Sequence, residues 1–188
     1  LLESLAIDGD EAQQVRDLKD LAALYGAVND RPAMLDTMRK VLARAPADSD
    51  ALTLLEDHLR QRGEHRELRD LWLRAIRSPM CPPEVRVPRL RDVGRVSSDD
   101  LGDIDAAIEA WREVVETIPT DGEGLQRLGE LLERAGRWEE YADVLGQRAD
   151  LAADASDRRD VLERLAAVHR ERRDDPNAEA AVLAMLWD

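Results

Sequence analysis

Apolar residues recur along this chain at every third or fourth position, in stripes separated by short breaks of Asn, Asp, Gly or Pro. The first two stripes are Leu18, Leu21, Ala22 and Tyr25, followed by Met34, Met38, Val41 and Leu42. This spacing places the apolar side chains on one face of an α-helix. Because only a short break at Asn29-Asp30 separates the stripes, and Pro46 follows the second, the pattern predicts a pair of antiparallel helices.

The same pattern returns after 34 residues. This separation relates the apolar pairs Leu21/Leu55, Tyr25/Leu59 and Met38/Trp72, and the glycines Gly102 and Gly136; Gly63 closes an earlier turn. Helix pairs that repeat at this length bury their apolar faces only against neighbouring pairs. We therefore predict an all-α fold, an α-solenoid of antiparallel helix pairs in a single domain. The pairs are expected over residues 15–48, 49–82, 83–121, 122–155 and 156–188.

Both ends of the chain are apolar. Leu1, Leu2 and Leu5 resemble the last turns of a preceding helix, so residues 1–14 are expected to be the end of one, and the chain stops on Leu186 and Trp187. Neither end has the polar face that caps a solenoid. Two interpretations are open: the repeats belong to the middle of a longer array, or Leu186 and Trp187 stack on a second copy and form a homo-oligomer.

The third helix pair departs from the period. Gly94 and Gly129 are 35 residues apart, whereas Gly102 and Gly136 are 34 apart, so one extra residue lies within Val96 to Leu101. A single inserted residue makes either a π-bulge or a longer first helix. Such bulges are frequent at functional sites, although a simple variation of the turn explains the insertion as well.

The fourth helix pair carries a family resemblance. Leu128 and Gly129 are followed three positions on by Leu132, Gly136 closes the turn, and Pro119 ends the preceding pair. This arrangement resembles the tetratricopeptide repeat (TPR). The resemblance implies a right-handed superhelix in which the first helix of each pair, the A helix, lines a concave groove that binds peptides or proteins.

The charge balance argues against nucleic acid as a partner. The chain has 41 acidic and 27 basic residues, a formal net charge of −14. Basic residues stand beside acidic ones, as between Glu130 and Arg134, so no basic stripe is present that would attract a phosphate backbone. No apolar run approaches the ~20 residues that span a bilayer, and the first residues lack the pattern of a signal peptide. We expect a bacterial, cytoplasmic protein without membrane insertion.

Catalytic and metal-binding patterns are missing from the sequence. Cys81 is the only cysteine and has no histidine nearby, while His58 and His65 are seven residues apart instead of one helical turn. His169 lies alone on an apolar stripe and is expected in the core or the groove. The segment Gly122-Glu123-Gly124 lacks the lysine of a phosphate-binding loop. We therefore predict no enzymatic activity, no cofactor and no metal.

The resemblance places a binding groove on the A-helix residues that are not used for packing. These residues are Arg16, Lys19, Asp20, Asp57, Arg60, Arg91, Arg95, Gln126, Arg127, Glu130, Arg134, Glu163, Arg164 and Arg170. Arginine forks suit carboxylates, so an acidic or C-terminal peptide is one candidate ligand. The alternative is that these arginines only pair with neighbouring Asp and Glu.

Some TPR proteins clamp the terminal carboxylate of a ligand with Lys and Asn at set A-helix positions. Only Lys19 matches here, because Ala23 and Leu54 occupy the asparagine positions. We therefore predict that the chain does not bind the acidic C-terminal tails recognised by chaperone-type TPR proteins.

The leading prediction is a non-catalytic scaffold that presents a groove to a peptide or protein partner. Two alternatives remain at this level: a self-association module that acts through its terminal helices, and a regulatory domain of a larger enzyme or transcription factor.

Overall fold

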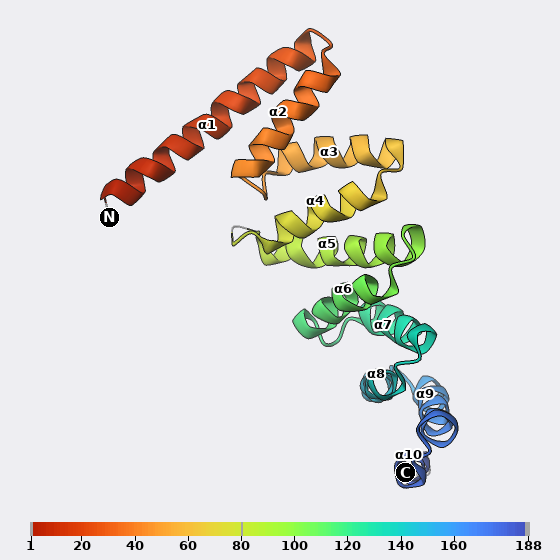
Figure 1. The fold of residues 1–188 in the computed structure, drawn as a ribbon. Helices are drawn as coiled ribbons and strands as arrows, with labels where there is room; N and C mark the ends of the chain where they lie inside the picture. The colour runs from red at the N-terminus through yellow and green to blue at the C-terminus, as the bar shows by residue number, and fades with distance from the viewer. Residues whose placement is uncertain (1, 80, 187–188) are drawn as a thin grey trace. The chain divides into compact units, whose positions relative to one another are not determined.

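All regular structure in the described part of the chain is helical (Figure 1). The computed structural model describes residues 2–79 and 81–186, and within them the side chains of all but residues 2–9 and 83. The elements are α1 (Leu2–Ala27), α2 (Arg31–Arg44), α3 (Ser49–Arg62), α4 (His65–Arg77), α5 (Pro83–Arg95), η1 (Val96–Asp100), α6 (Ile104–Thr117), α7 (Gly122–Ala135), α8 (Trp138–Asp150), α9 (Ala155–Val168), η2 (His169–Arg173) and α10 (Pro176–Met185). Odd-numbered α-helices are the A helices of successive repeats, and even-numbered α-helices are the B helices. The predicted all-α fold of antiparallel helix pairs is confirmed.

The same turn joins the two helices of every repeat. One residue takes the left-handed conformation, the next precedes the B helix, and the B helix starts at the second residue after the turn residue. The left-handed residues are Asn29, Gly63, Gly102, Gly136 and Asp174, with φ between 49° and 69°. Glycine and, less often, Asn or Asp tolerate this conformation, which explains their recurrence at the predicted breaks.

Two repeats are longer than the others, and one of the extra residues of each lies at the end of its A helix. Successive left-handed residues are 34, 39, 34 and 38 positions apart. In the third repeat the chain forms the π-helical segment Val96–Asp100, within the stretch where the sequence predicts one inserted residue, and the Leu101 amide donates to the Val96 carbonyl (3.1 Å). The π-bulge is thus the alternative that the structure adopts. A second π segment, His169–Arg173, extends the last A helix and was not expected.

Aspartates cap most of the helices. Their side chains accept hydrogen bonds from backbone amides in the first turn of α2, α3, α6, α7, α9 and α10. The capping residues are Asp30, Asp48, Asp103, Asp121, Asp154 and Asp175. Because Asp is among the best N-cap residues, part of the acidic surplus of the chain is helix chemistry rather than surface charge alone.

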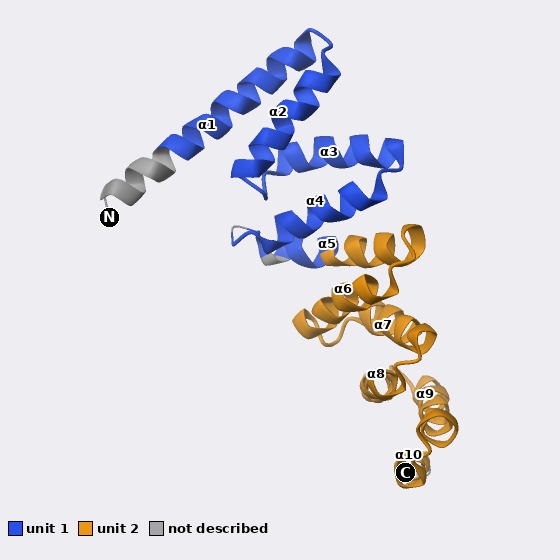
Figure 2. Cartoon of the chain, viewed as in Figure 1, with its two compact units in different colours: residues 1–89 blue, residues 90–188 orange. Residues whose placement is uncertain are grey.

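The chain divides into two compact units, Leu1–Arg89 (unit 1) and Leu90–Asp188 (unit 2) (Figure 2). Each unit has its own buried residues, with Leu55 and Trp72 among the largest in unit 1 and Ile108 and Trp111 among the largest in unit 2. α1 is continuous from Leu2 to Ala27, which differs from the separate helix expected over residues 1–14. No proline interrupts this stretch, and a single glycine costs a helix only about 1 kcal/mol.

Small residues in the A helices allow the B helices to approach closely. A Cβ placed on Gly94 would lie 2.4 Å from Nε1 of Trp111, which leaves no room for a side chain in α5. A Cβ on Gly129 in α7 would lie 3.5 Å from Tyr141, an ordinary contact. In α3 the same position, seven residues before the turn glycine, is Glu56. Its buried carboxylate lies 2.8 Å from the Arg89 guanidinium.

Candidate protein-interaction surfaces

The predicted groove residues all lie on A helices or on the π segment that extends α9. Most of their side chains are exposed, whereas Lys19 and Arg91 are half-buried. We call these side chains, on α1 and α3 and separately on α5, α7, α9 and η2, the A-helix surface. Some of its charged side chains bind other parts of the chain in the structure, and others do not.

Two of the predicted cations hold the capping aspartate of the next A helix. The ammonium of Lys19 lies 3.1 Å from Asp48 and 2.5 Å from Asp50, and these hydrogen bonds, that to Asp50 first, raise the pKa of Lys19. Arg91 in turn forms an ion pair with Asp121. Since Asp48 caps α3 and Asp121 caps α7, each cation ties one repeat to the start of the next.

Two further arginines make contacts between helices. Arg95 in α5 lies 2.6 Å from Glu123 in α7. Arg164 in α9 donates to both carboxylate oxygens of Glu133 in α7 at 2.8 Å, and its guanidinium lies 5.9 Å from the ring centre of Tyr141 in α8. These side chains therefore contribute to the packing of unit 2. The alternative interpretation of the sequence, in which the arginines pair with acids of the chain, holds for both of them. The acids, however, lie on other helices.

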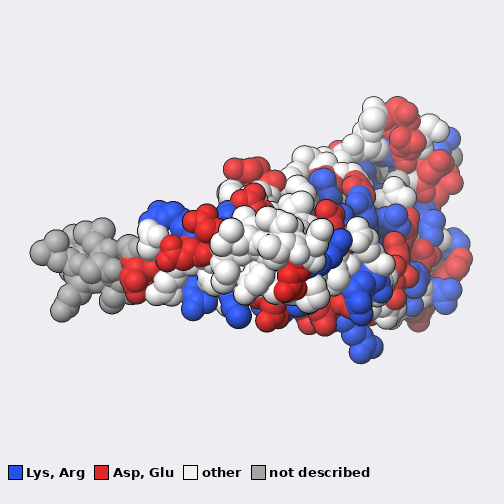
Figure 3. Space-filling model, turned by 90° about the horizontal axis from the view of Figure 1, so that it is seen from above, with Lys and Arg blue, Asp and Glu red and all other residues white. Residues whose placement is uncertain are grey.

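The remaining predicted residues are not tied to a neighbouring A helix. Arg127 and Gln126 contact Glu130 within α7, and Arg60 lies over the ring of Trp72. Arg16 donates to Gln13, and Arg170 pairs with Glu171 and Glu179. The side chains of four exposed residues form no hydrogen bond or ion pair with any other described residue: Asp20, Asp57, Arg134 and Glu163. The charges of both signs are interspersed on the face seen in Figure 3, without a basic stripe.

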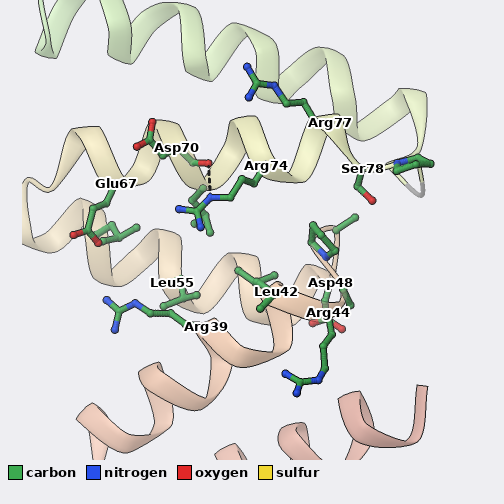
Figure 4. Close-up of a pocket in the computed structure, with 17 residues that line it drawn as sticks. Arg39, Leu42, Arg44, Asp48, Leu55, Glu67, Asp70, Arg74, Arg77 and Ser78 are labelled. Atoms are coloured by element: carbon green, nitrogen blue, oxygen red, sulfur yellow. Dashed lines mark hydrogen bonds between the residues drawn. The ribbon is translucent and has the colours of Figure 1, made fainter. Parts of the chain in front are cut away.

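A hollow that the sequence did not predict lies on the B-helix side of unit 1 (Figure 4). It has a volume of about 1110 Å³ and lies between α2 and α4, over α3. Leu42, Leu55, Leu59 and Leu71 supply its apolar lining. The sequence analysis used the apolar spacing within each helix. This spacing does not reveal how far apart the B helices of successive repeats lie, because that distance depends on side chains of both helices.

Charged side chains surround this hollow. Arginines from α2 and α4 and acids from α4 and from the turn before α3 line it, namely Arg39, Arg44, Arg74, Arg77, Asp48, Glu67 and Asp70. Arg39 and Glu67 stand at one end of the hollow, and Arg44 lies toward the other end (Figure 4). Arg39 and Glu67, both among the described side chains, are not joined by an ion pair.

On the corresponding face of unit 2 an ion pair joins the two B helices. Arg112 in α6 and Glu140 in α8 occupy the same positions as Arg39 and Glu67, ten and four residues after their turn residues. Their side chains lie 2.6 Å apart. Arg137 also binds Glu140 (2.6 Å), and this hydrogen bond is the main reason why the pKa of Glu140 is lowered.

Comparisons with known proteins agree with this architecture. No protein-family model matches the chain, and no curated protein matches it in sequence. Among solved structures, YrrB, described as a TPR protein with an unusual peptide-binding site, is 16% identical over 90% of this chain and 82% of its own, with a TM-score of 0.51. A mutant of MamA is 16% identical over 92% of this chain and 93% of its own, with a TM-score of 0.50. A TPR protein from Parabacteroides merdae is 12% identical over 93% of this chain and 74% of its own, with a TM-score of 0.48.

The chain has a TPR-like fold. The resemblance inferred from Leu128, Gly129 and Gly136 is therefore confirmed, and so is the solenoid of helix pairs. At identities this low the comparisons speak for the fold alone.

The TPR-like helices bring together no metal site among the described residues. Cys81 is half-buried. His169 is buried, as one of the two sequence interpretations has it, and burial, followed by the charge of Arg173, lowers its pKa. None of the helices in the described ranges is long and apolar enough to cross a membrane.

The first TPR-like helix exposes an apolar stripe at its end. Leu24 is 66% exposed and Val28 just after α1 is 72% exposed, and Leu21 lies one turn earlier on the same helix. At the other end of the chain Leu186 is half-buried, while Trp187, the second residue expected at a self-association surface, lies outside the described residues. The N-terminal repeat therefore offers a second exposed apolar surface that the sequence interpretation did not single out.

Proposed function

We propose that this chain is a non-catalytic protein-interaction scaffold that binds a peptide or protein partner on its A-helix surface. The observation that carries the proposal is the set of exposed A-helix charges that no other described residue binds: Asp20, Asp57, Arg134 and Glu163. They lie on α1, α3, α7 and α9, so four of the five repeats contribute one such side chain. The TPR-like fold supports this use, and the peptide-binding site described for YrrB is a precedent within the same fold.

The test separates binding from folding. The chain is used to capture partners from a native lysate, beside a variant with Arg127→Glu and Arg134→Glu. Both arginines are exposed and neither binds a neighbouring repeat. Arg91 and Arg95 are left unchanged because their ion pairs hold α7. We expect a partner that the variant loses.

A matched control carries the same change of charge on B helices, with Arg31→Glu and Arg66→Glu; both residues are exposed. The control should retain the partner. If the A-helix variant captures the same partner as the unchanged chain, the A-helix surface is not the binding site. Circular dichroism shows that both variants keep their helices.

Self-association is a second candidate function, favoured by the exposed Leu24 and Val28. Such apolar side chains on one helix face are typical of a contact with a further helix. Sedimentation over a range of concentrations tests it, with Leu24→Glu as the variant. A dimer that this variant abolishes supports self-association, and a monomer at all concentrations excludes it.

A further inference from the structure

We propose that the hollow between α2 and α4 binds an acidic peptide segment whose leucine-like side chains enter the hollow while its carboxylates bind the surrounding arginines. The inference rests on the proposed scaffold function but assigns it a second site, on the B-helix side of unit 1. It is distinct from the A-helix surface that the sequence predicts. Three features of the hollow carry it.

The first feature is the size and lining of the hollow. Its volume of about 1110 Å³ exceeds the ~300–1,000 Å³ typical of small-molecule pockets. Leu55 and Leu59 of α3 form buried apolar lining, and the half-buried Leu42 and Leu71 add to it from the two B helices. Water against the exposed parts of Leu42 and Leu71 is displaced favourably by apolar side chains. The hollow therefore fits several residues of a peptide rather than an ion.

The second feature is a surplus of positive charge. Four arginines face three acids around the hollow. One of these acids, Asp48, is already occupied, because it caps α3 and binds Lys19. One of the arginines, Arg44, likewise donates to Gln14 and to the carbonyl of Lys40. Arg74 uses its Nε for the backbone carbonyl of Asp70, the dashed line in Figure 4, and no other described group binds its terminal nitrogens. In a chain with a net charge of −14, this local excess of guanidinium groups favours carboxylates.

The third feature is the comparison with the corresponding face of unit 2. There Arg112 binds both Glu109 on its own helix, at 2.5 Å, and Glu140 of the next B helix, at 2.6 Å. Arg39 has only the first kind of partner among the described residues, Asp36 at 3.8 Å. A carboxylate from a ligand would take the place that Glu140 has in unit 2. The structure thus already contains the geometry in which an arginine at this position binds a carboxylate.

The same features favour a peptide over nucleic acid. Glu67 and Asp70 stand among the arginines and would repel a continuous phosphate backbone. A leucine-lined surface without an aromatic side chain gives bases nothing to stack on. A peptide supplies separate carboxylates and apolar side chains, which this mixed lining matches.

The experiment uses an array of short peptides with amidated C-termini, in which leucines at varied spacing are flanked by Asp and Glu. A matched array carries Asn and Gln in place of the acids, and another carries Ser in place of the leucines. Amidation removes the terminal carboxylate, so a clamp for C-terminal tails does not contribute. The strongest acidic peptide is labelled and titrated by fluorescence anisotropy against the whole chain.

Three proteins are compared: the unchanged chain, a variant with Arg39→Glu and Arg74→Glu, and a control with Arg127→Glu and Arg134→Glu on the A-helix surface. We expect the hollow variant to bind the acidic peptide roughly tenfold more weakly or worse, since two charge-assisted hydrogen bonds are lost. The control should bind as the unchanged chain does. If the hollow variant fails to fold, as judged by circular dichroism, Arg39→Gln with Arg74→Gln replaces it.

Several results would overturn the proposal. Acid-free or leucine-free peptides that bind equally well, an array without signal, or equal binding by the hollow variant would each exclude the site. A labelled RNA that binds more tightly than any peptide and is lost with Arg39→Glu would assign the hollow to nucleic acid instead. The lysate experiment is read separately: a partner lost only with Arg127→Glu and Arg134→Glu leaves the scaffold function standing without the hollow.

Discussion

In unit 2, Arg112 and Glu140 join the B helices α6 and α8, whereas in unit 1 Arg39 and Glu67 occupy the same positions and remain apart. The residue that precedes α8 in unit 2 differs in charge from the residue that precedes α4 in unit 1, and this explains why only unit 2 has the ion pair. In unit 2 this residue is Arg137, which binds Glu140 from one turn away. In unit 1 it is Glu64, which carries the same charge as Glu67 and binds Arg62 instead.

A pair of opposite charges at matching positions therefore does not by itself join two neighbouring B helices. An exposed ion pair is worth little because its side chains lose freedom and water screens the attraction. A third charge that fixes one partner in place reduces that loss. Arg137 has this role in unit 2, and its counterpart in unit 1 has the opposite sign.

The largest expected effect concerns the core beneath these faces. Trp111 and Met38 occupy the same position in the third and first repeats, nine residues after the turn residue, and are 1% and 9% exposed. Trp111→Ala should lower the free energy of unfolding by about 4 kcal/mol and Met38→Ala by about 2 kcal/mol, because the larger side chain leaves the larger cavity. Urea unfolding followed by circular dichroism measures both. Equal losses would mean that the two cores are packed alike.

The next largest effect concerns the close approach of α5 and α6 in unit 2. Gly94→Ala should cost about 2 kcal/mol, because its Cβ would overlap the buried ring of Trp111 and force it to move. Gly129→Ala, the control, meets Tyr141 only at contact distance and should be neutral or slightly stabilising, since alanine favours the helix by ~1 kcal/mol. The same unfolding experiment applies. A variant at Gly94 as stable as the control would contradict the packing described above.

A smaller effect tests the ion pairs directly. Arg137→Glu should release Glu140 and open the face between α6 and α8, at a cost of about 1 kcal/mol or less. The reciprocal change, Glu64→Arg, should bind Glu67 as Arg137 binds Glu140, favour an ion pair between Glu67 and Arg39, and so close the hollow in unit 1. Affinity for the acidic peptide is the measurement, and Glu64→Arg should weaken it. Unchanged affinity with a hollow closed in a crystal structure would separate the hollow from binding.

The smallest effect is a dependence on pH that belongs to unit 2, where His169 is buried. Burial and the charge of Arg173 lower the pKa of His169 below its ordinary 6.5, against the opposing charges of Asp175 and Asp143. The unfolded chain then takes up a proton at higher pH than the folded one, so this contribution to stability is present above about pH 6.5 and is lost as the pH falls through the lowered pKa. His169→Gln should flatten the loss between about pH 7.5 and 5.5 in urea unfolding. An identical slope in both proteins would show that His169 does not contribute.

The repeat, its turns and the place of one inserted residue could be predicted from the sequence, because each is a local property. Gly63, Gly102 and Gly136 mark turns by their conformational freedom, and the mismatch of 34 and 35 residues points to the segment that forms η1. The extension of the last A helix was missed. Its turn residue is Asp174 rather than glycine, and the periodicity is weak in that repeat.

The use of the charges could not be predicted in the same way. Lys19 and Asp48, or Arg91 and Asp121, are about thirty residues apart, and the spacing that brings them together depends on how one repeat packs on the next. The sequence pattern therefore predicts a binding surface on the A-helix arginines, although several of them stabilise unit 2. Likewise Glu56 stands where a small residue is usual, and only the fold brings Arg89 to its carboxylate. The hollow likewise depends on contacts between repeats, and on the absence of an ion pair between the described side chains of Arg39 and Glu67.

The fixed turn between the helices of each repeat has a consequence for how this chain tolerates changes of length. The B helix always starts at the second residue after the left-handed residue, whether the A helix before it is short or ends in a π segment. One added residue is taken up in the last turn of the A helix, where a wider backbone loop accommodates it without displacing the turn or the B helix. A single residue inserted at the end of α3 or α7 should therefore be accepted as it is after α5 and α9. Such an insertion should leave the contacts of the B helices as they are.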